Sequence, residues 1–274
     1  MGYYHLLGLE REPFSTSPDP DFFYESREHR AALMRLMIEV RLRRGLSWII
    51  GDVGTGKTTL SRKLFQMLKE REDIVFHMIL DPTYGTEELF LQSLIQIFNI
   101  QTPASNILHC KEALKDFLFR KGVEENKTTV LLIDEAQKLN DVSLEVLRVL
   151  LNYETNEYKL LQLVLMSQME LLPRLKGIKN LWDRISLRYA LNPLDEKETR
   201  QMIEFRLKIA GYESALPLFS EQAIAEIYCH TQGYPRQIAM LCHNALRRLV
   251  MVSKLTVEAS DIQTLIAQDA KIMV

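Results

Sequence analysis

The feature that most constrains the fold of this chain is a glycine-rich loop between an apolar run and an amphipathic segment. Residues Gly51, Gly56, Lys57 and Thr58 have the spacing G-x-x-x-x-G-K-[ST]. The run Trp48-Ile-Ile50 precedes the loop, and leucines recur at helical spacing after it. A strand, a tight loop and a helix in this order predict a parallel α/β sheet with an anion-binding loop at a strand end.

The residue types in this loop are those that wrap a nucleoside triphosphate. Glycines let backbone N–H groups turn toward phosphates without a Cβ in the way. We expect the Lys57 ammonium to reach the β- and γ-phosphates of ATP and the Thr58 hydroxyl to bind Mg²⁺. The alternative is a strand-to-helix turn that binds no ligand. The predicted nucleotide-binding residues of the loop are Gly51, Asp52, Val53, Gly54, Thr55, Gly56, Lys57, Thr58 and Thr59.

A second apolar run ends in two carboxylates. Residues 129–133 lead into Asp134 and Glu135, which is typical of a central parallel strand with acidic residues at its carboxyl end. We expect Asp134 to hold Mg²⁺ together with Thr58, and Glu135 to act as the general base on the attacking water. An acidic pair alone also fits a solvated helix N-terminus. With the glycine loop upstream, ATP hydrolysis is the favoured interpretation.

A third apolar run also ends in polar residues. Residues 160–166 lead into Ser167 and Gln168. The Gln168 amide can donate a hydrogen bond to phosphate or water, so we predict that it reaches the γ-phosphate at the same sheet edge. A plain turn at a strand end explains the same residues.

Several further motifs resemble those of the ExeA/GspA-type AAA+ ATPases. The likeness starts in three N-terminal segments, GYYHLLGLEREPF (2–14), SPDPDFFY (17–24) and REHRAAL (27–33). It continues in residues 51–58, 130–137 and 163–172, which match the family's Walker A motif, its Walker B motif (VLLIDEAQ) and its sensor 1 strand. The resemblance implies a AAA+ ATPase that binds and hydrolyses Mg·ATP at subunit interfaces.

The same resemblance implies roles for two arginines. The segment Asp183-Arg184-Ile185-Ser186 is similar to the one that bears the family's arginine finger, and Gly233-Tyr234-Pro235-Arg236 is similar to its sensor 2. A finger acts from a neighbouring subunit on the charge of the transition state, so Arg184 implies that hydrolysis requires an oligomer. Arg188 is the competing finger candidate. Pro235 fixes a turn before an apolar helix, from which Arg236 would project toward phosphate.

The periodicity of the chain changes at residue 192. Alternating patterns before it predict strands at 74–80, 129–134 and 185–191, and helices at 26–44, 86–98, 111–120 and 143–151. After Asn192-Pro193 the pattern is wholly helical, at 195–210, 220–230, 235–252 and 258–267. The predicted fold is α/β, a P-loop AAA+ parallel sheet flanked by helices and followed by a smaller all-helical lid. We expect residues 1–45 to pack on the core, residues 46–192 to form it, and residues 193–274 to form the lid.

Composition limits the compartment and the partners. With 274 residues, 47% hydrophobic content and a net charge of −2, the chain can bury a sizeable core and is not a general nucleic-acid coat. Its 3 cysteines have no metal-ligand spacing, which favours a reduced, cytoplasmic compartment. Because no run of about eighteen apolar residues occurs, we expect no membrane insertion.

The resemblance leaves two biological roles nearly level. One is a DNA-binding transposition regulator similar to the TnsC, TniB and MuB ATPases, which assembles as an ATP-dependent ring or filament on duplex DNA and recruits a transposase. The other is secretion-system assembly with secretion proteins as partners; the membrane span and cell-wall-binding region that follow the ATPase domain in ExeA are not expected in this sequence. A third reading is a nucleotide-gated scaffold with little turnover, against which the Asp134-Glu135 pair argues. Candidate DNA contacts are two basic clusters, Arg41, Arg43 and Arg44, and Arg174, Lys176 and Lys179.

Overall fold

The computed structural model describes residues 2–15, 17, 19–101 and 106–272, so Pro18 of the second N-terminal motif lies outside the described residues. The chain forms two compact units. The sheet unit comprises residues 28–53 and 60–191, and the lid unit comprises residues 1–27, 54–59 and 192–274. The N-terminal segment that the sequence analysis treated as one part is therefore shared between the two units.

The sheet unit is built on five parallel strands in the order β2-β3-β4-β1-β5. The strands are β1 (Leu46–Gly51), β2 (Ile74–Ile79), β3 (Thr128–Ile133), β4 (Leu161–Ser167) and β5 (Ile185–Leu191). Strands β3 and β4 are buried at every position, as parallel strands are when helices cover both faces of the sheet. The parallel sheet predicted from the alternating pattern is confirmed.

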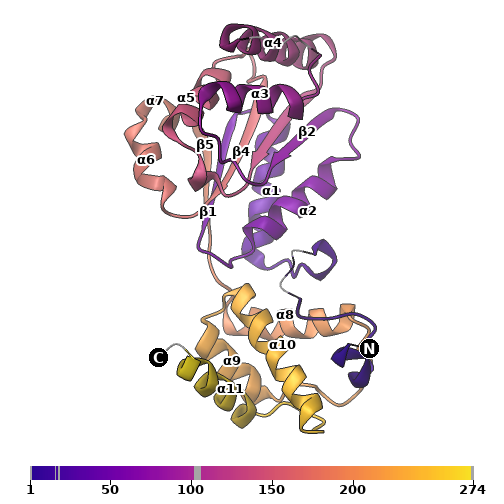
Figure 1. The fold of residues 1–274 in the computed structure, drawn as a ribbon. Helices are drawn as coiled ribbons and strands as arrows, with labels where there is room; N and C mark the ends of the chain where they lie inside the picture. Colours follow the sequence, from indigo (N-terminus) through magenta and orange to yellow (C-terminus); the bar gives the residue numbers. More distant parts are fainter. Residues whose placement is uncertain (1, 16, 18, 102–105, 273–274) are drawn as a thin grey trace. The chain divides into compact units, whose positions relative to one another are not determined.

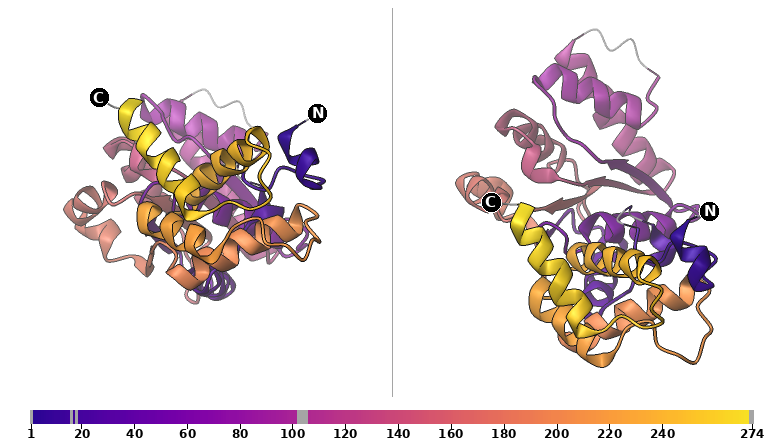
Figure 2. Two further views of the ribbon diagram at one scale, coloured as in Figure 1. Left: turned by 90° about the horizontal axis from the view of Figure 1, so that it is seen from below. Right: turned by 60° about the horizontal axis from the view of Figure 1, so that its bottom comes forward.

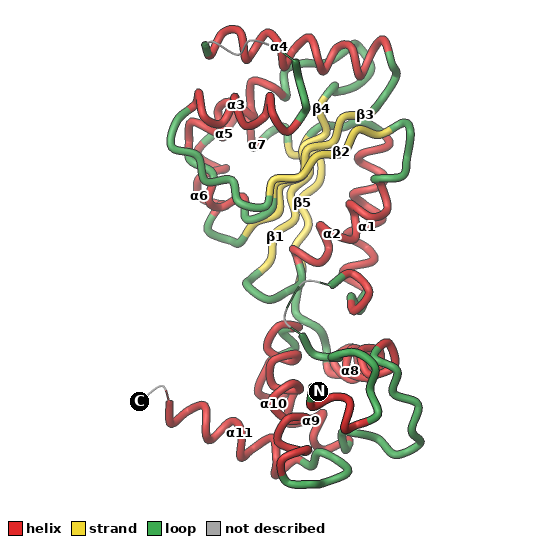
Figure 3. The backbone as a smooth tube through the Cα atoms, turned by 45° about the vertical axis from the view of Figure 1, so that its right-hand side comes forward, coloured by secondary structure: helices red, strands yellow, loops and turns green. Residues whose placement is uncertain are grey.

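Helices cover both faces of this sheet (Figure 1 and Figure 3). One face carries α1 (Arg27–Arg41) and α2 (Lys57–Leu68). The other carries α3 (Glu87–Ile97), α4 (Ile107–Phe119), α5 (Asp141–Leu150), α6 (Leu171–Gly177) and α7 (Lys179–Trp182). The strands and the helices of this second face share one hydrophobic core, which includes the strand residues Trp48 and Leu163 and the helix residues Phe90 and Leu147. Each such fully buried side chain stabilises the fold by roughly 2 kcal/mol.

The lid unit consists of four helices and the N-terminal segment. The helices are α8 (Glu196–Ile209), α9 (Glu221–Thr231), α10 (Pro235–Met251) and α11 (Ala259–Ile272). Leu9, Phe14 and Phe22 belong to the same hydrophobic core as these helices. Figure 2 shows the N-terminal segment in indigo beside the orange and yellow lid helices. The helical lid expected from the sequence is present.

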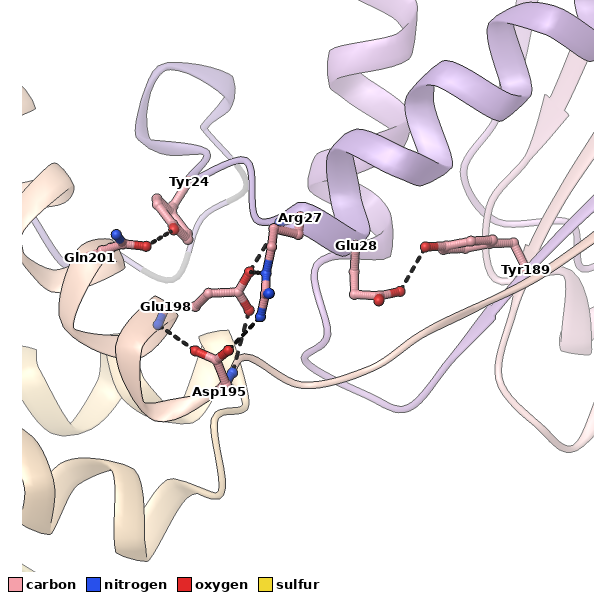
Figure 4. Close-up of polar contacts among 7 residues, drawn as sticks. All are labelled: Tyr24, Arg27, Glu28, Tyr189, Asp195, Glu198 and Gln201. Atoms are coloured by element: carbon pink, nitrogen blue, oxygen red, sulfur yellow. Dashed lines mark hydrogen bonds and ion pairs between the residues drawn. The ribbon is translucent and has the colours of Figure 1, made fainter.

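Two consecutive residues mark the first of the points where the chain passes from one unit to the other (Figure 4). Arg27 belongs to the lid unit, where its Nη2 atom lies 2.6 Å from Asp195 Oδ2 and its Nε atom lies 3.3 Å from Glu198 Oε1. Glu28 belongs to the sheet unit, where its Oε2 atom accepts a hydrogen bond from the Tyr189 hydroxyl at 2.7 Å. The Arg27 side chain is therefore held by residues of the lid unit, and the Glu28 side chain is held by a residue of the sheet unit.

No helix among the described residues combines the length and the apolar composition needed to cross a membrane.

Candidate nucleotide site

The ends of the strands that lead into the predicted motifs lie at one edge of the sheet because the strands are parallel. Strand β1 ends at Gly51, β3 at Ile133 and β4 at Ser167. Strand β4 pairs with β1 on one side and with β3 on the other, so the ends of β1 and β3 lie about 10 Å apart at the usual strand spacing. The Walker A loop, the Asp134-Glu135 pair and Gln168 follow these three strand ends. This edge is where open α/β sheets bind their ligands.

The conformation of the Walker A loop requires its glycines. Gly54 and Gly56 have φ angles of +86° and +97°, in the left-handed region that side chains disfavour. Lys57 is the first residue of α2 and is only 5% exposed. A glycine loop that turns into a helix N-terminus, with a buried lysine at its start, fits a nucleoside polyphosphate.

The two acidic residues after β3 differ in their surroundings. Asp134 is 1% exposed, whereas Glu135 is half-buried. Glu135 has φ +50° and ψ +36°, a left-handed conformation that costs a residue with a side chain roughly 1 kcal/mol. The chain therefore holds backbone strain at the residue predicted to act as general base.

The donor set fits Mg²⁺ bound together with a nucleotide. Thr58 supplies a hydroxyl oxygen and Asp134 a carboxylate, and Mg²⁺ prefers oxygen ligands. No group of three or more His, Cys, Asp or Glu side chains among the described residues is arranged to hold a metal ion.

The structure adds one residue that the sequence analysis did not single out. Gln137 Nε2 donates a hydrogen bond to Glu135 Oε2 at 2.6 Å, and the Gln168 backbone N–H donates to Gln137 Oε1 at 3.1 Å. The predicted reach of the Gln168 side chain to the γ-phosphate stays a prediction. The signal in the sequence was the amide that ends the DEAQ run, two residues after Glu135.

Both finger candidates make contacts within their own chain. Arg184 Nη1 donates to the Arg148 carbonyl oxygen at 3.1 Å. The Arg188 guanidinium lies 3.8 Å from the centroid of the Trp182 ring and donates to the Trp182 carbonyl oxygen at 2.8 Å. Either arginine would have to leave these contacts to reach a neighbouring subunit, and the choice between them stays open.

The glycine and the proline of the Gly-x-Pro-Arg motif each have a geometric reason. Gly233 has φ +77°, and a Cβ there would overlap the carbonyl oxygen of Leu194. Pro235 is the first residue of α10, where its missing N–H has no helical partner to lose. The Arg236 backbone N–H donates to the Gly54 carbonyl oxygen at 3.3 Å. Within the lid unit, the predicted sensor 2 arginine thus lies beside the Walker A loop.

Comparison with known proteins identifies the family. A family model described as an AAA domain matches residues 40–175. General secretion pathway protein A of Aeromonas hydrophila is 37% identical over 249 residues, which are 89% of this chain and 44% of that protein. The chain belongs to the AAA+ P-loop proteins and is similar to the ExeA/GspA type. This AAA+ protein spans less than half the length of its secretion relative.

Solved structures support the AAA+ fold. The Aeropyrum pernix ORC2 protein, in its ADPNP–ADP complexes, has a TM-score of 0.67 and 17% identity, over 94% of this chain and 71% of that chain. Cdc6p of Pyrobaculum aerophilum has a TM-score of 0.65 and 18% identity, over 89% of this chain and 67% of that chain. The RuvB Holliday junction branch migration motor of Thermotoga maritima has a TM-score of 0.55 and 15% identity, over 86% and 67% of the respective chains. These likenesses confirm the predicted fold class.

Proposed function

We propose that this AAA+ protein binds Mg·ATP at the Walker A loop and hydrolyses it to ADP and phosphate. The observation that supports the proposal is that β1, β3 and β4, the three strands that lead into the predicted motifs, end at one edge of a parallel sheet. Lys57 supplies positive charge for the phosphates, Asp134 a metal ligand and Glu135 a base. A strand-to-helix turn that binds no ligand would not require an acidic pair at the end of β3, which is separated from β1 by β4 in the sheet.

Each residue has one chemical task in this proposal. Thr58 and Asp134 would hold Mg²⁺, which when bound neutralises charge on the phosphate oxygens. Glu135 takes a proton from water as the water oxygen forms its bond to the γ-phosphorus and the bond to the ADP oxygen breaks. Lys57 stabilises the negative charge that develops on the transferred phosphoryl group.

Three further residues act on the same charge. The Gln168 amide would donate to the γ-phosphate or to the attacking water, and Arg236 would contact phosphate from the lid. Arg184 would approach from a neighbouring subunit, with Arg188 as the competing candidate. Turnover then depends on self-association into a ring or filament.

For the biological role we propose secretion-system assembly, with the ATP cycle controlling self-association and the binding of secretion proteins at the cytoplasmic side. The A. hydrophila relative is named for the general secretion pathway, and its identity to this chain is 37%. This relationship favours the secretion role over the DNA-binding transposition role, with which the sequence analysis ranked it nearly level.

The basic clusters also weaken the DNA role. Arg43 Nε donates to Thr128 Oγ1 at 2.9 Å, and its guanidinium lies 4.5 Å from the centroid of the Tyr158 ring. Arg174 Nη2 lies 2.7 Å from Asp141 Oδ1. One arginine of each cluster is therefore committed to contacts inside its own chain.

The experiment combines nucleotide binding with particle size. We expect the wild type with Mg·ATP to form larger particles by light scattering than with Mg·ADP, and Lys57→Ala to lose both ATP binding and assembly. The control is Lys69→Ala, which removes the same charge from an exposed position just after α2. It should bind and assemble like the wild type.

Duplex DNA at several salt concentrations separates the two roles. Assembly and turnover that DNA does not change support the secretion role. Phosphate contacts weaken steeply as salt rises, so stimulation by DNA that declines with salt would contradict the secretion role and favour the transposition-type regulator. Assembly by Lys57→Ala equal to that of the wild type would contradict the nucleotide site itself.

A further inference from the structure

Gln137 connects the predicted general base to the end of β4. It lies in the short 3-10 helix Ala136–Lys138, directly after Glu135. Its side-chain amide binds Glu135 Oε2 at 2.6 Å through Nε2 and the Gln168 backbone N–H at 3.1 Å through Oε1. We propose that Gln137 is a positioning residue that fixes the Glu135 carboxylate for water activation and ties its orientation to the turn after β4. This inference rests on the ATP hydrolysis proposed above.

The hydrogen-bonding partners define the orientation of the Gln137 amide. A backbone N–H is only a donor and a carboxylate is only an acceptor. Rotating the amide by half a turn would place its oxygen against the Glu135 carboxylate and its NH₂ group against the Gln168 N–H. Both hydrogen bonds would then be lost, so only one orientation serves both partners.

The backbone of Gln137 is anchored independently of its side chain. Arg174 Nη1 donates to the Gln137 carbonyl oxygen at 3.2 Å, and Arg174 Nη2 in turn lies 2.7 Å from Asp141 Oδ1. The preceding residue, Ala136, is fully buried. Because its backbone is held, the Gln137 amide presents a fixed donor to Glu135.

Gln168, the residue that binds Gln137 Oε1, is itself connected through Ser167 to β1, the strand that leads into the Walker A loop. Ser167 Oγ donates to the Gln168 carbonyl oxygen at 3.0 Å, and the Trp48 indole N–H donates to Ser167 Oγ at 2.8 Å. Trp48 lies in β1 and is fully buried. The turn that holds Gln137 Oε1 is thus anchored to the interior of the sheet.

The contact has a direct consequence for catalysis. Gln137 donates to Oε2 of Glu135, and in this proposal Oε1, which accepts no hydrogen bond from Gln137, takes the proton from water. A hydrogen bond to the ionised carboxylate also restricts rotation of the side chain. Positioning matters for the rate because a misplacement of about 1 Å can cost roughly a hundredfold in turnover.

The test replaces Gln137 in two ways. Gln137→Leu removes both hydrogen bonds at similar size, and Gln137→Glu keeps an acceptor for Gln168 N–H but removes the donor to Glu135. We expect both variants to lower kcat by about tenfold or more and to change the Kd for ATP by less than about twofold. Combining Gln137→Leu with Glu135→Gln should lower the rate no further than Glu135→Gln alone, because the two residues act as one unit.

The matched control is Gln92→Leu. Gln92 Nε2 donates to Glu88 Oε1 at 3.3 Å on the exposed surface of α3. Gln92→Leu therefore loses a Gln–Glu contact that does not involve Glu135, and it should keep the wild-type kcat. A wild-type kcat in Gln137→Leu would overturn the inference while leaving the proposed function intact. An equal further loss in the double variant would overturn it too. A wild type that releases no phosphate would remove the proposed function, and the inference with it.

Discussion

At the scale of single residues, backbone geometry explains why some glycines of this chain cannot be replaced without a loss of stability while others can. Gly233 has φ +77° and faces the Leu194 backbone, whereas Gly8 has φ +74° with open space around it. Gly85 has open space and no positive φ. The three positions therefore separate the cost of a left-handed conformation from the cost of a backbone clash.

Substitution of these glycines by alanine should give graded losses of stability. We expect Gly233→Ala to lower the free energy of unfolding by at least about 2 kcal/mol and Gly8→Ala by about 1 kcal/mol. Gly85→Ala should be neutral or slightly stabilising. Urea unfolding followed by circular dichroism measures all three. A Gly233→Ala variant no less stable than Gly8→Ala would show that the close approach to Leu194 is not a constraint.

The sequence predicted where the strands end, but not the contact between residues that follow two of these strands. Lys57, Asp134 and Glu135 were predicted as site residues because a strand followed by a polar motif is a local pattern, and the strand ends lie at one edge of the sheet as expected. Gln137 was missed because its meaning depends on Gln168, which is 31 residues away in the chain. Neither the strain at Glu135 nor the anchoring of Arg43 and Arg174 has a sequence signal of its own.

At the scale of elements, periodic segments were predicted close to their observed bounds. Strand β5 (Ile185–Leu191) coincides with its prediction, and α10 (Pro235–Met251) ends one residue earlier than the predicted 252. The short helices α6 and α7 were not predicted, because a helix of one or two turns has too few residues to show a period. The segment 122–127, which has the composition of a loop, begins within a π-helical turn (Arg120–Glu124).

Asp261 joins the first turn of α11 to the loop before it. Its carboxylate accepts hydrogen bonds from Lys254 Nζ at 2.7 and 3.0 Å and from the Glu258 backbone N–H at 3.1 Å. Burial opposes its ionisation, but the hydrogen bonds from Lys254 and Glu258 and the positive charges of Lys254 and Arg248 together outweigh burial and hold the pKa of Asp261 below its usual range. A lowered pKa in the folded state stabilises the protein above the unfolded pKa, and this stability is lost as pH falls through the folded pKa.

Replacing Asp261 should therefore give a pH-dependent loss. At pH near 7 we expect Asp261→Asn to lower the free energy of unfolding by about 1 kcal/mol, and the difference from wild type should shrink as pH falls below about 4. Urea unfolding at a series of pH values checks this, with Asp116→Asn at an exposed position of α4 as the control. A difference that stays constant across the acid range would contradict the charge-based account.

At the scale of the whole molecule, the chain divides into a sheet unit and a lid unit that share the Walker A loop. Residues 54–59 belong with the lid helices, while β1 before them and the rest of α2 after them belong with the sheet. The all-helical character of the lid followed from periodicity, but the packing of residues 1–27 with the lid did not. Phe14 and Phe22 pack in the hydrophobic core of the lid helices, which are distant in sequence. Nothing in the sequence around these two residues indicates which helices they contact.

The central claim is that this AAA+ protein hydrolyses ATP with Glu135 as the base. The most direct test measures phosphate release and ATP binding on the same samples of the wild type and Glu135→Gln. The account predicts that the wild type turns ATP over, and that Glu135→Gln binds ATP with a Kd within about twofold while its turnover falls by about a hundredfold or more. Unchanged turnover in Glu135→Gln would contradict the assigned base, and a wild type that binds ATP without releasing phosphate would make the protein a nucleotide-gated scaffold.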